Sequence, residues 1–388
     1  MPALNLPTAG GRVEPYTLVG EPCPLPLQTA AWTRNVFAAA HVVVDPLADI
    51  DPTLATAIDW ERTLAFRDYL WGMGFGVAEA MDTAQRGMGL DWPHALELVQ
   101  RSARAAKARG GALIASGAGT DHLPEDGSLT IDAVTDAYLM QCEAIEATGS
   151  QVILMASRAL AKAARGPDDY LKVYGKVLGQ LQRPAILHWL GEIFDPALAG
   201  YWGTDSVDAA MATALQVIGE NKAKVDGIKI SLLSAEREIE MRRALPQGVV
   251  MYTGDDFNYP DLIAGDEQGY SHALLGIFDP IAAAAATALA ALATGDRSRY
   301  DKVMAPTVPL SRHIFKAPTR FYKTGVVFLA YLNGFQDHFT MLAGQENTRS
   351  TLHLAELIRL ADQAGVLLDP DKAVARAKPV FAARGVAC

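Results

Sequence analysis

The segment Lys224-Val225-Asp226-Gly227-Ile228-Lys229-Ile230-Ser231 has the length and composition of a short strand that is buried on both faces. Because side chains alternate along a strand, Gly227 and Lys229 share one face, while Ile228 and Ile230 share the other. The isoleucines suit a face that is covered by helices. Lys229 is then expected on the inner face, near the carboxyl end of its strand.

The same theme, a short apolar run followed by a turn and a stretch of helical periodicity, recurs along the chain. The strand candidates are Ala39–Val44, Gly76–Ala80, Ala112–Ser116, Val152–Met155, Ala185–Leu190, Val225–Ile230, Val249–Thr253 and Tyr270–Leu274. Strands that alternate with helices predict a parallel sheet, and eight is the strand number of a (β/α)8 TIM barrel. A doubly wound open sheet is the alternative.

Helical patterns without intervening strands follow the eighth run. They cover Asp279–Thr294, Arg297–Phe315, Thr319–Leu332, Ser350–Ala364 and Asp369–Ala383. The last begins with Asp369-Pro370, a capping residue followed by proline at the first helical position. We therefore expect three parts: an irregular N-terminal lead-in over residues 1–38, the barrel over 39–295 and a C-terminal helical extension over 296–388.

Composition excludes several classes of protein. The chain has 388 residues, of which 50% are hydrophobic and 20% charged, so it can bury a large core. A net charge of -10 without a Lys/Arg-rich run argues against a nucleic-acid partner. We find no span-length apolar run and no signal-peptide pattern, so we expect a cytoplasmic protein outside the membrane. Cys23, Cys142 and Cys388 are too widely spaced to indicate a disulfide framework or a zinc site.

Four motifs carry a resemblance to a known family. They are Gly227-Ile228-Lys229 on the sixth strand, Thr253-Gly254-Asp255-Asp256 after the seventh, the turn Gly117-Ala118-Gly119-Thr120 after the third, and Asp279-Pro280 after the eighth. Over roughly residues 39–335 the order of these segments resembles the dihydrodipicolinate synthase and N-acetylneuraminate lyase family.

The resemblance implies a class I aldolase or related lyase in which Lys229 forms a Schiff base with a 2-oxo acid or a keto-sugar derivative. It implies no exogenous cofactor, no metal and a homodimer or homotetramer. Burial favours the neutral, nucleophilic form of a lysine amine, which suits this role. The alternative is an ordinary lysine that reaches solvent from a strand end. Substrate contacts are expected from Gly117, Gly119, Thr120, Gly254, Asp255 and Asp256.

Two strands depart from the family pattern. His188 stands where the family has its relay tyrosine, and a histidine titrates near neutral pH, so it is a candidate general acid/base. A packing role is the alternative. The second strand ends in Glu79 and Asp82 instead of adjacent threonines. Either carboxylate could bind a substrate hydroxyl or act as a base, or form a structural salt bridge.

Two further functions stay open on the sequence. His41, His188 and His272 lie on predicted strands and Asp45 follows one, which raises the alternative of a metal-assisted isomerase or aldolase. Their spacing matches no metal-binding motif. The second alternative is a non-catalytic barrel that binds a small metabolite.

Overall fold

The computed structural model describes residues 1–24, 31–124 and 129–387, so Cys388 lies outside the described part. The chain divides into two compact units. One unit consists of residues 34–39 and 76–276 and contains the eight observed strands of the barrel; the other consists of residues 1–33, 40–75 and 277–388.

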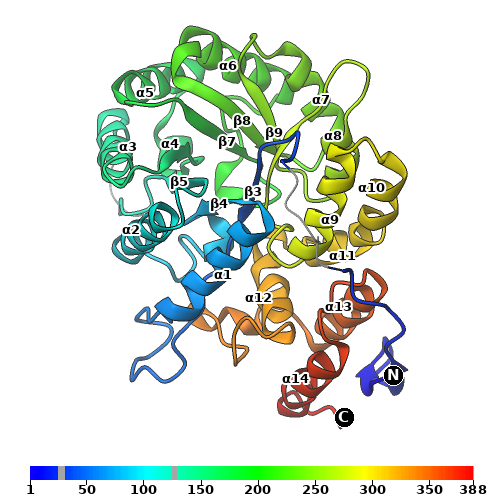
Figure 1. Ribbon diagram of the computed structural model, residues 1–388. Coiled ribbons are helices and arrows are strands. Elements are labelled where there is room, and N and C mark those ends of the chain that lie inside the picture. The colour runs from blue at the N-terminus through cyan, green and yellow to red at the C-terminus, as the bar shows by residue number, and fades with distance from the viewer. Residues whose placement is uncertain (25–30, 125–128, 388) are drawn as a thin grey trace. The chain divides into compact units, whose positions relative to one another are not determined.

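Eight parallel strands close into a barrel, each paired with the next along the chain and the last with the first (Figure 1). They are β3 (Val36–Ala39), β4 (Gly76–Glu79), β5 (Ile114–Ala118), β6 (Gln151–Leu154), β7 (Ala185–Leu190), β8 (Val225–Ser231), β9 (Val250–Thr253) and β10 (His272–Leu275). Leu274 opposite Phe37 is part of the closing pair. Most strand residues are buried, as expected for a parallel sheet with both faces covered. The closed sheet confirms the predicted (β/α)8 barrel and rules out the alternative of a doubly wound open sheet.

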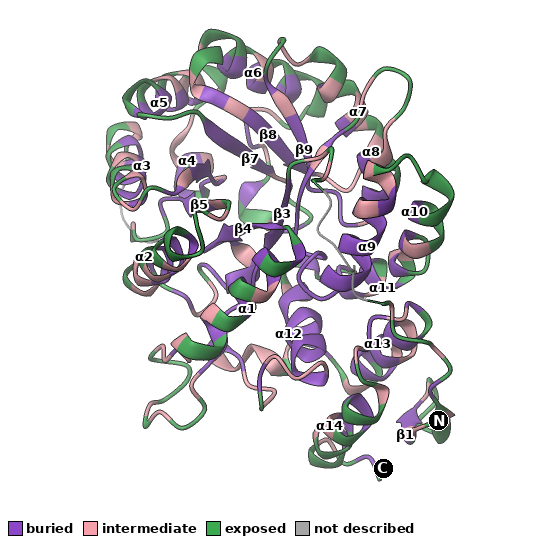
Figure 2. Cartoon of the chain, viewed as in Figure 1, coloured by how far each residue is buried: buried purple, intermediate pink, exposed green. Residues whose placement is uncertain are grey.

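The helices of this unit lie around the outside of the strands (Figure 1). They are α2 (Trp92–Ala108), α3 (Ile131–Glu146), α4 (Arg158–Ala163), α5 (Pro167–Gln180), α6 (Val207–Glu220), α7 (Ala235–Ala244) and α8 (Tyr259–Ala264), with single 3-10 turns η1 (Asp82–Ala84), η2 (Pro196–Leu198) and η3 (Lys222–Lys224). Figure 2 shows that α2, α3, α5 and α6 each have buried and exposed residues. Several of these helices follow a capping residue whose side chain accepts a hydrogen bond from a backbone N–H group of the first turn. Examples are Asp91, Thr130 and Ser206.

Apolar side chains fill the barrel interior. Phe37 and Tyr252 meet edge to face with ring centroids 6.0 Å apart, and Ile153 and Ile186 pack in the same cluster. A Cβ atom at Gly227 would lie 2.8 Å from the Tyr252 ring. The glycine of the Lys229 strand therefore provides the space that this large side chain occupies.

The other unit combines a hairpin with helices. The hairpin pairs β1 (Ala3–Pro7) with β2 (Val13–Thr17) antiparallel. The helices are α1 (Trp60–Met73), α9 (Ala282–Ala293), α10 (Arg297–Met304), α11 (Thr307–Ile314), α12 (Tyr322–Leu332), α13 (Thr351–Gln363) and α14 (Pro370–Ala383), with the 3-10 turns η4 (Thr319–Phe321) and η5 (Leu342–Asn347). The helical extension is as expected, and Asp369 caps α14. Within the described ranges, no helix combines the length and the apolar character needed to cross a membrane.

Two expectations about the N-terminal part are wrong. The lead-in is not wholly irregular, because it contains the β1–β2 hairpin. The first barrel strand covers Val36–Ala39 and not Ala39–Val44. The apolar run continues beyond the strand, where Val44 forms an isolated antiparallel bridge with Ile58. Hydrophobicity marked the buried segment, but it could not show where strand pairing ends.

Candidate active site around Lys229

Lys229 lies inside the barrel, toward the carboxyl end of β8. It shares the inner face of the strand with Gly227, and only 8% of it is exposed. Burial lowers the pKa of the Lys229 amine, and the nearby carboxylates of Asp256 and Asp82 act in the opposite direction without reversing the shift. In the described part of the chain, the amine forms no hydrogen bond or ion pair. The predicted inward position of the lysine is thus observed.

His188 lies beside Lys229 on the neighbouring strand. The two residues are register partners of the β7–β8 pair. The imidazole is 1% exposed, its Nε2 is 3.3 Å from the Ser231 hydroxyl, and its Nδ1 is buried without a hydrogen-bond partner among the described residues. Burial, and then the charge of Lys229, hold the pKa of His188 well below its usual range. A neutral imidazole therefore lies next to the lysine.

The turn after β9 packs directly against Lys229. A Cβ atom on Gly254 would lie 2.8 Å from Lys229 Cε and 2.4 Å from Ser231 Oγ, so this position requires glycine. Asp255 accepts hydrogen bonds from the backbone N–H groups of Phe257 and Asn258 at 2.8 and 3.0 Å. Its carboxylate therefore stabilises the turn, while that of Asp256 is close enough to act electrostatically on Lys229.

The two acids predicted at the end of β4 have different positions. Glu79 is buried and accepts hydrogen bonds from Ser102 of α2 at 2.6 Å and from the backbone N–H of Ala80 at 2.9 Å. It lies on the outer face of the strand, because alternation places Ala78 in the interior cluster. The expected catalytic role of Glu79 is therefore not supported. Asp82, on η1, is the acid of this pair that acts on Lys229.

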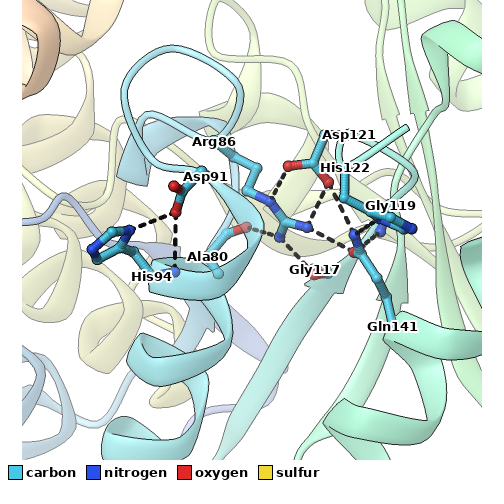
Figure 3. Close-up of polar contacts among 9 residues, drawn as sticks. All are labelled: Ala80, Arg86, Asp91, His94, Gly117, Gly119, Asp121, His122 and Gln141. Carbon is cyan, nitrogen blue, oxygen red and sulfur yellow. Dashed lines mark hydrogen bonds and ion pairs between the residues drawn. The ribbon is translucent and has the colours of Figure 1, made fainter. Parts of the chain in front are cut away.

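The turn after β5 is held by its own hydrogen bonds. The Gly119 N–H donates to Gln141 Oε1 at 2.7 Å, and the Gly117 carbonyl accepts from Arg86 at 3.0 Å (Figure 3). Thr120 Oγ1 is 2.6 Å from Ser157 Oγ. The expected substrate contact through the Gly119 N–H is therefore not supported, because this group is already bonded.

Arg86 organises this region, and no sequence signal indicated it. Its guanidinium forms a two-pronged contact with Asp121 at 2.7 Å for each oxygen, and it also donates to Gln141 Oε1 and the Ala80 carbonyl (Figure 3). Burial alone would raise the pKa of Asp121, but the hydrogen bonds and charge of Arg86 lower it below its usual value. The side chain thereby ties the loop after β4 to the turn after β5.

Strained backbone also occurs beyond the carboxyl ends of strands. Ala80, directly after β4, has φ 54°, and Leu233, two residues after β8, has φ 55°. Non-glycine residues in this region are costly, and they cluster at functional sites. Ala80 lies between β4 and Asp82, and Leu233 follows the strand that contains Lys229.

The histidines considered as metal ligands do not converge. His272 begins β10, and its Nδ1 accepts the backbone N–H of Asn35 at 2.9 Å. His41 belongs to the other unit, where its Nδ1 is 2.7 Å from Asp279. Over residues 1–24, 31–124 and 129–387, no three His, Cys, Asp or Glu side chains are grouped so that they could hold a metal ion.

The fold is shared with solved dihydrodipicolinate synthase structures. The chain is similar to the enzyme from Aquifex aeolicus (TM-score 0.64, 13% identity, 87% of this chain and 99% of that chain). It is also similar to the Acinetobacter baumannii enzyme complexed with pyruvate (TM-score 0.63, 14% identity, 86% of this chain and 99% of that chain). A third similar structure is YagE, a prophage protein of the same family from E. coli K12, in complex with pyruvate (TM-score 0.66, 13% identity, 87% of this chain and 100% of that chain).

At this level of identity the likeness concerns the fold. No protein with curated functional information matches the chain significantly. A family model described as "Protein of unknown function (DUF993)" matches residues 4–386, which is nearly the whole chain. The chain therefore belongs to the DUF993 family, built on the barrel fold of the dihydrodipicolinate synthases.

Proposed function

We propose that the protein is a class I aldolase or lyase that forms a Schiff base between Lys229 and the carbonyl carbon of a 2-oxo acid or keto-sugar derivative. The observation that carries the proposal is the buried Lys229 amine, whose pKa is lowered by its surroundings and which points into the barrel beside a neutral His188. A deprotonated amine is the form that attacks a carbonyl carbon. The pyruvate complexes of two similar structures support a carbonyl substrate.

The neighbouring residues suit the proton transfers of imine formation. Attack by Lys229 Nζ forms the N–C bond, and the carbonyl oxygen takes up a proton to give a carbinolamine. Loss of water then gives the imine, which draws electrons from the adjacent carbon. His188, whose pKa burial holds well below its usual range, can accept these protons only transiently and returns them readily, and the Ser231 hydroxyl, 3.3 Å from Nε2, orients the ring.

The test is reductive trapping. Incubation with a carbonyl substrate and borohydride should give an irreversible adduct on Lys229, located by mass spectrometry of peptides. Lys229→Arg should abolish both the adduct and turnover, because guanidinium does not deprotonate in proteins. Lys222→Arg, at the exposed residue that begins η3, is the matched control and should label as the wild type does.

Two results would overturn the proposal. One is full turnover in Lys229→Arg. The other is turnover that EDTA destroys and a divalent ion restores while no adduct forms, which would assign the protein to metal-assisted chemistry.

A further inference from the structure

The charges around Lys229 are predominantly negative. Asp256 is buried, Asp82 is half-buried, and both act electrostatically on the Lys229 amine. Geometry supports the same placement, because the turn that carries Asp256 packs on Lys229 Cε through Gly254. His188 adds no positive charge, since burial keeps its ring neutral. A bound carboxylate would therefore face two carboxylates.

Two groups beyond the neighbouring strands that could offset this repulsion, the Arg86 guanidinium and the Gly119 N–H, are already engaged. Arg86 donates to both oxygens of Asp121, to Gln141 and to two backbone carbonyls. The Gly119 N–H is bonded to Gln141. A substrate carboxylate is normally held by a guanidinium fork or by free backbone N–H groups. The Arg86 fork and the Gly119 N–H are not available for that role (Figure 3).

We infer that the substrate of Lys229 is an uncharged, hydroxylated ketone or aldehyde with no carboxylate beside its carbonyl group. This inference rests on the proposed Schiff-base function and narrows its substrate class from 2-oxo acids to keto-sugar-like compounds. Carboxylates accept hydrogen bonds from hydroxyl groups, so Asp82 and Asp256 select for hydroxyls where a carboxylate would be repelled.

The experiment compares two compounds of nearly equal size. Hydroxyacetone and pyruvate each have a methyl ketone, with a hydroxymethyl group in the first where the second has a carboxylate. In both, Lys229 Nζ bonds to the ketone carbon, the ketone oxygen leaves as water, and borohydride adds hydride to that carbon. Labelling rates are divided by those of free N-acetyl-lysine methylamide, which removes the difference in intrinsic reactivity.

The wild-type protein should label with hydroxyacetone at least about tenfold faster than with pyruvate, which corresponds to about 1.4 kcal/mol. Repulsion between like charges in a partly buried site is large enough to give this ratio. Asp82→Asn and Asp256→Asn should each shift the ratio toward pyruvate. Asp168→Asn, which removes an exposed carboxylate in the first turn of α5, should leave it unchanged.

The possible failures can be told apart. If pyruvate labels Lys229 faster than hydroxyacetone in the wild type, the inference is overturned while the Schiff-base proposal stands. If neither hydroxyacetone nor dihydroxyacetone labels Lys229, the inference fails, and a simultaneous failure of pyruvate counts against the Schiff-base proposal as well. The wild-type comparison does not depend on whether the aspartate variants fold.

Discussion

Arg86→Met should destabilise the protein by an amount that its contacts allow us to calculate. The side chain is 2% exposed and donates five hydrogen bonds: two to Asp121, one to Gln141 and one each to the Ala80 and Gly117 carbonyls. Removing one partner of a buried ion pair typically costs about 3–5 kcal/mol. Over a chain of 388 residues, the unfolding entropy of about 2.1 cal/mol/K per residue gives about 0.8 kcal/mol/K, so Tm should fall by about 4–6 °C.

Calorimetry of the wild type and two variants measures this effect. Arg101→Met is the matched control on α2. Arg101 pairs with Glu97 one turn away, with side chains 36% and 42% exposed, and such surface pairs contribute about 0.5 kcal/mol or less. Equal Tm losses in the two variants would refute the assignment of Arg86 as the organising residue.

The pH dependence provides a second check. The pKa of Asp121 is lowered in the folded protein, so its stabilisation by Arg86 is present above the ordinary value of 3.8 and is lost as pH falls through the lower, folded value. The stability difference between wild type and Arg86→Met should therefore be constant from neutral pH to about pH 5 and shrink below about pH 4. A difference that stays constant to lower pH would show that packing, and not the ion pair, is what the variant loses.

Three further predictions concern His188 and Gly254 beside Lys229, and Glu238 on α7, whose carboxyl group accepts a hydrogen bond from Ser271 at 2.7 Å. His188→Phe should lower turnover by roughly a hundredfold or more with an unchanged circular dichroism spectrum; near-normal turnover would leave His188 with a packing role. Gly254→Ala should slow borohydride trapping, because its Cβ would lie 2.5 Å from the Ile230 carbonyl and 2.8 Å from Lys229 Cε, and unchanged trapping would show that the turn moves freely. Burial raises the pKa of Glu238 to about 8, so the stability contributed by its protonated form is complete below pH 4.5 and is lost as pH rises toward 8. Denaturant unfolding measures the difference in the free energy of unfolding between Glu238→Gln and the wild type. This difference should favour the variant more at pH 8 than at pH 5, and a difference that does not change with pH would contradict the prediction.

The barrel could be predicted from the sequence because its strands are continuous apolar runs separated by helical periodicity. The interval from Val225 to Ile230 differs from the observed β8 by one residue. Alternation also placed Lys229 on the inner face. The hairpin of Ala3–Pro7 and Val13–Thr17 was missed because prolines 7 and 15 within short runs argue against strands.

The site was only partly predictable, for physical reasons that differ between residues. Glu79 was chosen because it is an acid at a strand end, and only the structure, which places Ala78 in the interior cluster, shows that Glu79 is on the outer face. Arg86 left no such signal. Its partner Asp121 is 35 residues away, and nothing in the intervening sequence shows that two loops beyond neighbouring strands meet. Side-chain networks between loops depend on three-dimensional closure, which local patterns do not encode.

The departures from the family pattern at the second and fifth strands are best understood together. A protonated imine on Lys229 would be a cation in a buried site, and an anion nearby is needed to stabilise it. A 2-oxo acid brings such an anion in its own carboxylate, whereas here Asp82 and Asp256 supply negative charge from the protein. With that charge built in, a second anion on the substrate would add repulsion without further benefit. A neutral His188 beside the cation then avoids a second positive charge and retains a nitrogen that can accept a proton. Under the proposed Schiff-base function, the residues that stand in place of the threonine pair and the tyrosine would therefore suit a different substrate on the same lysine.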